Sequence, residues 1–152
     1  MDIRLDRELS DPRIIDLLHE HLRDMARHSP PESIHALDLD GLRRPEVSFW
    51  TVWHGEALLG CGALKELAPA HGEIKSMRTA EAHRRKGVAA SMLRYLLDEA
   101  ARRSYRTLSL ETGSMAAFEP ARRLYASYGF TYCAPFADYV DDPNSVFMTR
   151  DL

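Results

Sequence analysis

The segment HRRKGVAASML, residues 83–93, holds the residues of this sequence that are best suited to bind an anion. Three consecutive cations and a glycine lead into the first turn of a helical pattern, as Arg84, Arg85, Lys86 and Gly87. The glycine can adopt backbone angles closed to other residues, and Ala89 and Ala90 keep the side chains near the backbone short. Because the free N–H groups of a first helical turn bind phosphate groups, we predict a pyrophosphate site here.

The alternative for this segment is a solvated basic loop that precedes a helix. The helix dipole disfavours positive charge at a helix N-terminus, so cations at this end suggest a bound anion that offsets them. Neither common phosphate motif fits, because GxxxxGK[ST] has its lysine after the glycine and GxGxxG has two further glycines. Here Lys86 precedes Gly87, and Gly87 stands alone.

Hydrophobic periodicity and turn residues predict the elements that position this segment. It lies between a strand at 73–79 and a strand at 107–112, and its apolar helical stripe runs from Val88 to about Arg103. The other predicted elements are a strand at 2–6, a helix from Asp11 to the Pro30–Pro31 pair, a hairpin of strands at 47–53 and 57–64, a helix at 120–128, and two short strands around Tyr132 and at 145–149. The stretch 32–45 fits either a short amphipathic helix or a loop folded over another part of the chain, and we predict a helix there.

Length and composition indicate a single globular domain over residues 1–152. Hydrophobic residues make up 45% and charged residues 28%, which excludes wholesale disorder and fibrous repeats. The formal net charge of -3 argues against a surface built throughout for nucleic acid.

Two cysteines, Cys61 and Cys133, are too few for a disulfide scaffold or a four-ligand zinc site, and we expect no metal. No stretch approaches ~18 apolar residues, so we expect a cytoplasmic protein without a membrane segment.

Two segments resemble motifs of one enzyme family. RRKGVA at 84–89 is similar to the RxxGxA pattern of motif A in the GCN5-related N-acetyltransferases (GNAT), and ARRLYASYGF at 121–130 is similar to the family's AxxLYxxxGF. EIKSMRT at 73–79, SLETG at 109–113 and a tail of the form Y…DPxSxFM resemble small bacterial members. The resemblance covers about residues 47–150 and implies an α/β (α+β) fold, with a mixed, mostly antiparallel, twisted β-sheet flanked by helices on both faces.

The resemblance also implies which residues bind acetyl-coenzyme A (acetyl-CoA). The strand before motif A holds the pantetheine arm through backbone groups, here those of Met77, Arg78 and Thr79. Amides from Arg84 or Arg85 through Val88 to Ala90 cradle the pyrophosphate, and the side chains of residues 84–86 reach phosphate oxygens. In the second motif, Phe118 and Ala121 lie against the cofactor. This chain departs from the family here, because many members carry asparagine at the position of Phe118 and use it to contact the cofactor arm.

Acetyl transfer to an amine requires a proton acceptor and a proton donor, since an amine of pKa ~10 is mostly protonated at neutral pH. Glu73 occupies a position where the resembled family often places a general base, and its alternative role is that of a surface acid at a strand end. A backbone N–H near Met77 would stabilise the oxyanion. Tyr125 matches the family's usual acid, which protonates a thiolate whose thiol titrates near ~8.5; its alternative role is aromatic packing.

We expect the acetyl acceptor to be a small-molecule amine or an amino acid, bound by the segment 28–45, the 64–73 loop and the C-terminal strands. Direct transfer in a ternary complex is expected, because Cys61 lies in an apolar strand without an activating base. The alternative function is a non-catalytic or weakly catalytic acyl-CoA-binding regulatory module. Nucleic-acid binding through residues 83–86 is disfavoured by the acidic total charge, and a homodimer is compatible with the family.

Overall fold

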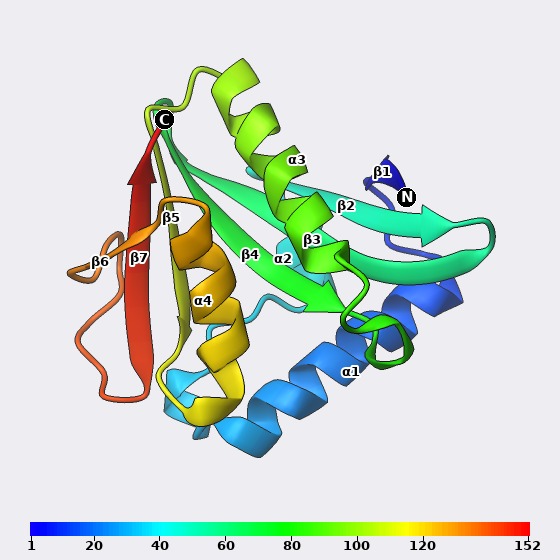
Figure 1. Cartoon of the computed structure of the whole chain (residues 1–152), viewed down its shortest axis with the longest axis horizontal. Helices are drawn as coiled ribbons and strands as arrows, with labels where there is room; N and C mark the ends of the chain where they lie inside the picture. The colour runs from blue at the N-terminus through cyan, green and yellow to red at the C-terminus, as the bar shows by residue number, and fades with distance from the viewer.

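The computed structural model describes residues 1–152, and it contains one seven-stranded sheet in the order β1-β2-β3-β4-β5-β7-β6 (Figure 1). All neighbouring strands pair antiparallel except β4 and β5, which are parallel. The strands are β1 (Asp2–Asp6), β2 (Val47–His54), β3 (Ala57–Ala68), β4 (His71–Thr79), β5 (Thr107–Gly113), β6 (Thr131–Cys133) and β7 (Ser145–Asp151).

Helices cover both faces of this sheet (Figure 1). They are α1 (Pro12–His28), α2 (Leu39–Leu42), α3 (Val88–Arg102) and α4 (Glu119–Ser127), with short 3-10 turns η1 (Pro31–Ser33), η2 (Glu81–His83) and η3 (Ala116–Phe118). The side chains of β2 alternate between the two faces: Trp50 and Val52 pack with α3, whereas Phe49 and Trp53 pack with α1 and α2. The predicted mixed sheet between helices is therefore confirmed.

Helix α1 begins and ends where its sequence signals predict. The Asp11 side chain accepts a hydrogen bond from the Arg13 N–H at 2.9 Å, and Pro12 occupies the first turn. The helix ends at His28, because Ser29 is extended ahead of Pro30. Its buried face carries Ile14, Leu17, Leu18 and His21.

The predicted helix within 32–45 is mostly wrong. This stretch contains the end of η1 and the four-residue helix α2, and the backbone between them has no regular structure. Leu37, Leu39 and Leu42 pack on the core beneath α1, whereas Ile34 lines a cavity. A spacing that suits a helix face is therefore produced by an irregular segment that lies over the core and the cavity.

Strands β4 and β5 separate part of the way along their length. They pair only from His71 to Ile74 on β4, opposite Thr107 to Leu110 on β5, and the rest of each strand is unpaired with the other. Figure 1 shows the two strands diverging toward the end of α1. On its other edge, β4 carries a bulge against β3, because Cys61 pairs with Arg78 but Ala63 pairs with Lys75. The divergence opens the sheet in its centre.

No helix of the chain is long and apolar enough to span a bilayer. No cluster of three or more histidine, cysteine or acidic side chains is arranged to hold a metal ion.

Candidate active site

The larger of two adjoining cavities lies where β4 leaves β5, and it has a volume of about 640 Å³. Its walls come from the second half of β4, the first turn of α3, η3, α4 and the inner face of α1. Every residue predicted to bind the cofactor lines it except Lys86. The ammonium of Lys86 lies 3.2 Å from the His83 ring instead, in the exposed part of the loop.

The N-terminus of α3 opens onto this cavity. Gly87 is the N-cap residue and adopts the left-handed region at φ 79°, with no side chain capping the helix. A Cβ added to Gly87 would meet no atom within 4 Å, so the backbone there is uncovered. The first backbone bond of the helix runs from the Ser91 N–H to the Gly87 carbonyl, which leaves the preceding amides available to a ligand. This geometry suits a pyrophosphate.

Arg78 and Arg84 connect this cavity to α1. The Arg78 guanidinium, whose side chain is 8% exposed, pairs with Asp24 at 2.6 Å and Glu20 at 3.0 Å, and Arg84 lies 3.6 Å from Asp24. Burial is the largest single influence and would raise the pKa of Asp24, but the hydrogen bond from Arg78 and the positive charges of Arg78, Arg27 and Arg84 together outweigh it, and the pKa is lowered. The Arg78 side chain is thus engaged by α1, whereas Arg84 has a longer and more exposed contact.

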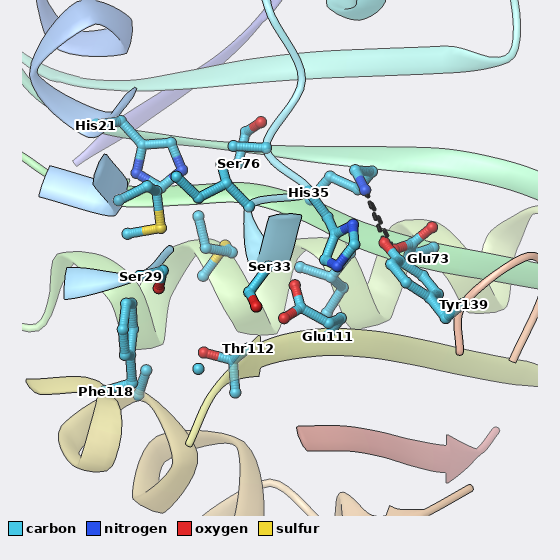
Figure 2. Close-up of a pocket in the computed structure, with 18 of the residues that line it drawn as sticks. His21, Ser29, Ser33, His35, Glu73, Ser76, Glu111, Thr112, Phe118 and Tyr139 are labelled. Atoms are coloured by element: carbon cyan, nitrogen blue, oxygen red, sulfur yellow. Dashed lines mark hydrogen bonds and ion pairs between the residues drawn. The ribbon is translucent and has the colours of Figure 1, made fainter. Parts of the chain in front are cut away.

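A smaller cavity of about 130 Å³ continues from the first one between β4 and β5. The two cavities share His21, Met25, Met77, Phe118, Ala121 and Tyr125. In Figure 2, His21 and Phe118 lie at one end of the smaller cavity, Glu73 and Tyr139 lie at the other, and Glu111 lies between them. Because the shared residues include His21 and Phe118, that end faces the larger cavity and the Glu73 end is distal to it.

Glu73 is buried rather than a surface acid, since it is only 2% exposed. Its Oε2 accepts hydrogen bonds from the Tyr139 hydroxyl at 2.5 Å and from the Lys75 ammonium at 3.3 Å. Lys75 also donates to the Tyr139 hydroxyl at 3.0 Å. The predicted base therefore lies in the cavity, but one of its oxygens is already bound by two neighbours.

Glu111 is a candidate functional residue that the sequence prediction missed. It lines the smaller cavity from the part of β5 that no longer pairs with β4. Burial raises its pKa to about 7, because desolvation outweighs the hydrogen bond and charge that favour the ionised form. The segment SLETG resembled the family, but nothing local distinguishes a cavity glutamate from a solvated one at the end of a strand.

Tyr125 lies on the boundary of both cavities, as its predicted role requires. It is 6% exposed, and its ring contacts Phe130 edge-on at 5.8 Å, so it is also part of the core. Burial and the negative charge of Glu111 raise the pKa of its hydroxyl, which keeps the proton in place at neutral pH. The Phe118 ring closes the neighbouring wall by packing over Gly113, where an added Cβ would collide with the ring.

The fold, the open helix N-terminus and the paired cavities define an acyltransferase, and comparison with known proteins gives its family. The model of the acetyltransferase (GNAT) family matches residues 14–130, and the chain belongs to that family. It is 60% identical over 152 residues to an uncharacterized N-acetyltransferase, YsnE of Bacillus subtilis, with 100% of both chains covered. It is 50% identical over 145 residues to an uncharacterized N-acetyltransferase, YedL of Escherichia coli, with 95% of this chain and 91% of that protein covered.

Solved structures share the fold. A Klebsiella pneumoniae chain described as an acyl-CoA N-acyltransferase is 27% identical, with a TM-score of 0.79 and coverage of 99% of this chain and 97% of that chain. A Bacillus subtilis acetyltransferase in complex with CoA is 19% identical, with a TM-score of 0.71 and coverage of 99% and 97%. The resemblance inferred from the two motifs is confirmed, and the protein is an acyltransferase enzyme.

Proposed function

We propose that this protein transfers the acetyl group of acetyl-CoA to the primary amine of a small molecule, by direct attack while both substrates are bound. The observation that carries the proposal is the pair of adjoining cavities, which meet at Tyr125 and Met77. The larger one contains an uncovered helix N-terminus flanked by arginines, which suits a pyrophosphate. The smaller one contains a carboxyl whose pKa of about 7 suits proton uptake at neutral pH.

The residues of the larger cavity fit acetyl-CoA in both charge and shape. The amides after Gly87 and the side chains of Arg84 and Arg85 face the space where the pyrophosphate would lie. The half of β4 that contains Met77 and Thr79 is unpaired with β5, so its backbone groups on that edge can bond to the pantetheine arm. The acetyl-CoA thioester supplies an electrophilic acyl carbon and a thiolate leaving group.

Glu111 is better placed than Glu73 to take the proton of the acceptor amine. It lies nearer the cofactor end of the smaller cavity (Figure 2), and its charge is felt by Tyr125. Glu73 lies at the distal end and holds Tyr139 and Lys75. We therefore propose Glu111 as the base. The sequence-based choice of Glu73 stays a prediction, and the pH dependence of kcat/KM in variants of the two residues distinguishes them.

The remaining steps account for the bonds and protons of the transfer. Glu111 first takes one proton from the ammonium, and the free amine nitrogen then forms its bond to the acyl carbon while the N–H of Met77 stabilises the oxyanion. The C–S bond then breaks, the Tyr125 hydroxyl donates its proton to the departing thiolate sulfur, and the second proton lost by the nitrogen restores the Tyr125 hydroxyl. A covalent acyl-cysteine is disfavoured, because burial raises the pKa of Cys61 to about 12 and keeps it a thiol.

A thermal melt with saturating acetyl-CoA tests the proposal directly. At about 100 times the dissociation constant, binding adds roughly 2.7 kcal/mol, which for this size corresponds to a rise in Tm on the order of 5 to 10 °C. Gly87→Trp fills the space at the α3 N-terminus and should abolish the rise. Gly55→Trp is the matched control, because Gly55 also has positive φ and open space but lies in the β2–β3 turn.

Release of free thiol from acetyl-CoA with a panel of primary amines measures turnover. A thermal shift without thiol release from any amine would favour the non-catalytic acyl-CoA-binding module. The absence of a shift in the unmodified protein would overturn the proposed function.

A further inference from the structure

The distal end of the smaller cavity contains a buried ammonium that the transfer reaction itself does not require. The Lys75 side chain is 8% exposed and lines this cavity together with Glu73, Tyr139 and His35. Its nitrogen lies 3.3 Å from Glu73 Oε2, 3.0 Å from the Tyr139 hydroxyl and 5.6 Å from the centre of the Tyr139 ring. Burial of an ammonium costs free energy, and its positive charge repels a cationic amine. The presence of Lys75 in an acceptor site therefore needs an explanation.

The Lys75 charge is only partly satisfied by its neighbours. An ammonium has three N–H donors, and two are directed at Glu73 and Tyr139. The Lys75–Glu73 separation exceeds the ~2.7–2.9 Å of a close charged pair, because the short 2.5 Å bond on the same oxygen comes from Tyr139. The third donor therefore remains for a group inside the cavity.

Three acidic or basic side chains other than histidine line the smaller cavity: Lys75 and Glu73 from β4, and Glu111 from β5. Asp142 lies outside the lining, and its carboxylate accepts a 2.5 Å hydrogen bond from Ser33, which does line the cavity. The ring of His35 contacts Tyr139 edge-on at 4.9 Å, and burial followed by the Lys75 charge lowers the His35 pKa. Among charged groups, Lys75 also has the largest influence on Glu111. The positive field of Lys75 therefore extends into the cavity despite Glu73.

A ligand in this cavity meets the Glu111 carboxyl partway along its length and the Lys75 ammonium at the distal end (Figure 2). Glu111 has no cationic partner of its own, and Lys75 has a free donor. A simple amine could pair with Glu111, but its uncharged end would then lie against the Lys75 ammonium. A molecule with an ammonium at one end and a carboxylate at the other complements both groups.

We propose that the acceptor is a small amino acid, with its amine beside Glu111 and its carboxylate bound by the Lys75 ammonium. This inference rests on the proposed acetyltransferase function and names the acceptor class for the same site. Lys75 is then a specificity-determining residue, and Glu73 and Tyr139 hold its ammonium in position. The volume of about 130 Å³ restricts the acceptor to a small molecule.

Matched acceptors test the requirement for a carboxylate. Thiol release is measured for a panel of L-amino acids, each compared with its carboxamide and with the amine that lacks the carboxyl group. For the best amino acid, kcat/KM should exceed that of both analogues by about 10- to 100-fold, the usual effect of a charged hydrogen bond. Equal or faster acetylation of the analogues overturns the proposal, as does a panel in which no amino acid is acetylated.

Two variants test whether Lys75 causes the preference for an acceptor that carries a carboxylate. Lys75→Met combined with Glu73→Gln removes both charges of the buried pair, so no uncompensated carboxylate remains. The comparison is the ratio of kcat/KM values for amino acid and amine within one variant, which cancels any effect of Glu73 on turnover. This ratio should fall to near one in the double variant and stay within about threefold of the original in Lys75→Arg, which keeps the charge. An unchanged ratio in the double variant overturns the role of Lys75.

A binding measurement separates this inference from the proposed function. If acetyl-CoA raises the Tm but amines and amino acids are acetylated alike, the enzyme stands and only the acceptor class is wrong. If acetyl-CoA produces no rise, both are wrong. With CoA bound, the preferred amino acid at millimolar concentration should raise the Tm further, and this second rise should be lost in the double variant; its retention there contradicts the role of Lys75.

Discussion

At the scale of single residues, burial sets the charge of the smaller cavity. It raises the pKa of Glu111 to about 7 and lowers the pKa of His21 to about 4, with Arg78 adding to the second effect. Both groups are thereby shifted toward their neutral forms, because desolvation penalises whichever form is charged. At neutral pH, His21 adds no positive charge that would repel a cationic amine, and Glu111 can still accept a proton.

The pH dependence of kcat/KM distinguishes the two candidate bases. A base must be deprotonated, so activity should rise with pH through an apparent pKa of about 7, the value for Glu111. Glu111→Gln should lower kcat/KM by about 100-fold or more and remove this limb. Glu73→Gln should keep it. A limb near 7 that survives in Glu111→Gln but is lost in Glu73→Gln would return the role of base to Glu73.

Tyr125→Phe separates proton donation from packing. The change removes the hydroxyl but keeps the ring that contacts Phe130. Turnover should fall by about 100-fold or more, as for loss of a general acid, while the affinity for acetyl-CoA in a thermal melt stays within a few fold. An unchanged turnover would leave Tyr125 with a packing role alone.

The open N-terminus of α3, where we propose that the pyrophosphate binds, could be located from the sequence because its determinants are local. Cations, a glycine and the start of a helix follow one another within residues 84–90. Glu111 was not predictable in this way, because its environment depends on where β4 stops pairing with β5. That position, after Ile74 and Leu110, is set by tertiary packing and leaves no local signal in SLETG.

At the scale of elements, the bulge in β4 orients the strand that lines both cavities. Ser76 and Met77 together face the single residue Gly62 of β3, and Ser76 has φ 55°. A Cβ on Gly62 would lie 2.7 Å from Met92 Cγ and 2.9 Å from the Met77 sulfur, so a larger residue opposite the bulge would displace these two methionine side chains. The Cys61 thiol donates a 3.2 Å hydrogen bond to the Ser76 carbonyl and thus holds the bulge from the neighbouring strand.

Substitution of Cys61 tests whether this hydrogen bond positions the Met77 N–H, which we propose as the oxyanion-binding group. Cys61→Ala removes the donor and leaves a buried carbonyl unpaired, so stability in urea should fall by about 1–3 kcal/mol and KM for acetyl-CoA should rise severalfold. Cys61→Ser has nearly the same volume as the alanine variant but keeps an O–H donor, and it should recover most of both losses. Equal effects of the two variants would show that the thiol only fills space.

The sequence predicted nearly every strand and helix but not the segment 32–45, and this difference has a physical cause. Elements such as α1 and α3 bury one continuous stripe, so their periodicity is visible in the sequence. The stretch from Ile34 to Leu42 instead bridges the cavity and the core, and the Asp38 side chain caps the short α2 through the Gly41 N–H at 2.8 Å. Residues 33–36 of this segment line the smaller cavity, which is the proposed acceptor site.

At the scale of the whole molecule, two cores lie on opposite faces of one sheet. One contains Trp50 with residues of α3 and α4, and the other contains Trp53 with residues of α1 and α2. Adjacent strands contribute to both cores by alternation, so neither core can lose its packing without disturbing strands that the other needs. The site at the β4–β5 divergence lies between the helices of the two faces, with His21 from α1 and Tyr125 from α4.

This arrangement predicts that the chain unfolds as one unit, and the two tryptophans report each core separately. Leu93 is 0% exposed in the α3 core, so Leu93→Ala should cost about 2–5 kcal/mol and lower Tm by roughly 5–15 °C. In a Trp50→Phe background, fluorescence of Trp53 reports the opposite core and should show the same decrease in Tm. Far-UV circular dichroism should give a coincident transition. A Trp53 transition that stays at its original temperature would mean that the two cores melt independently and that the chain is not a single cooperative domain.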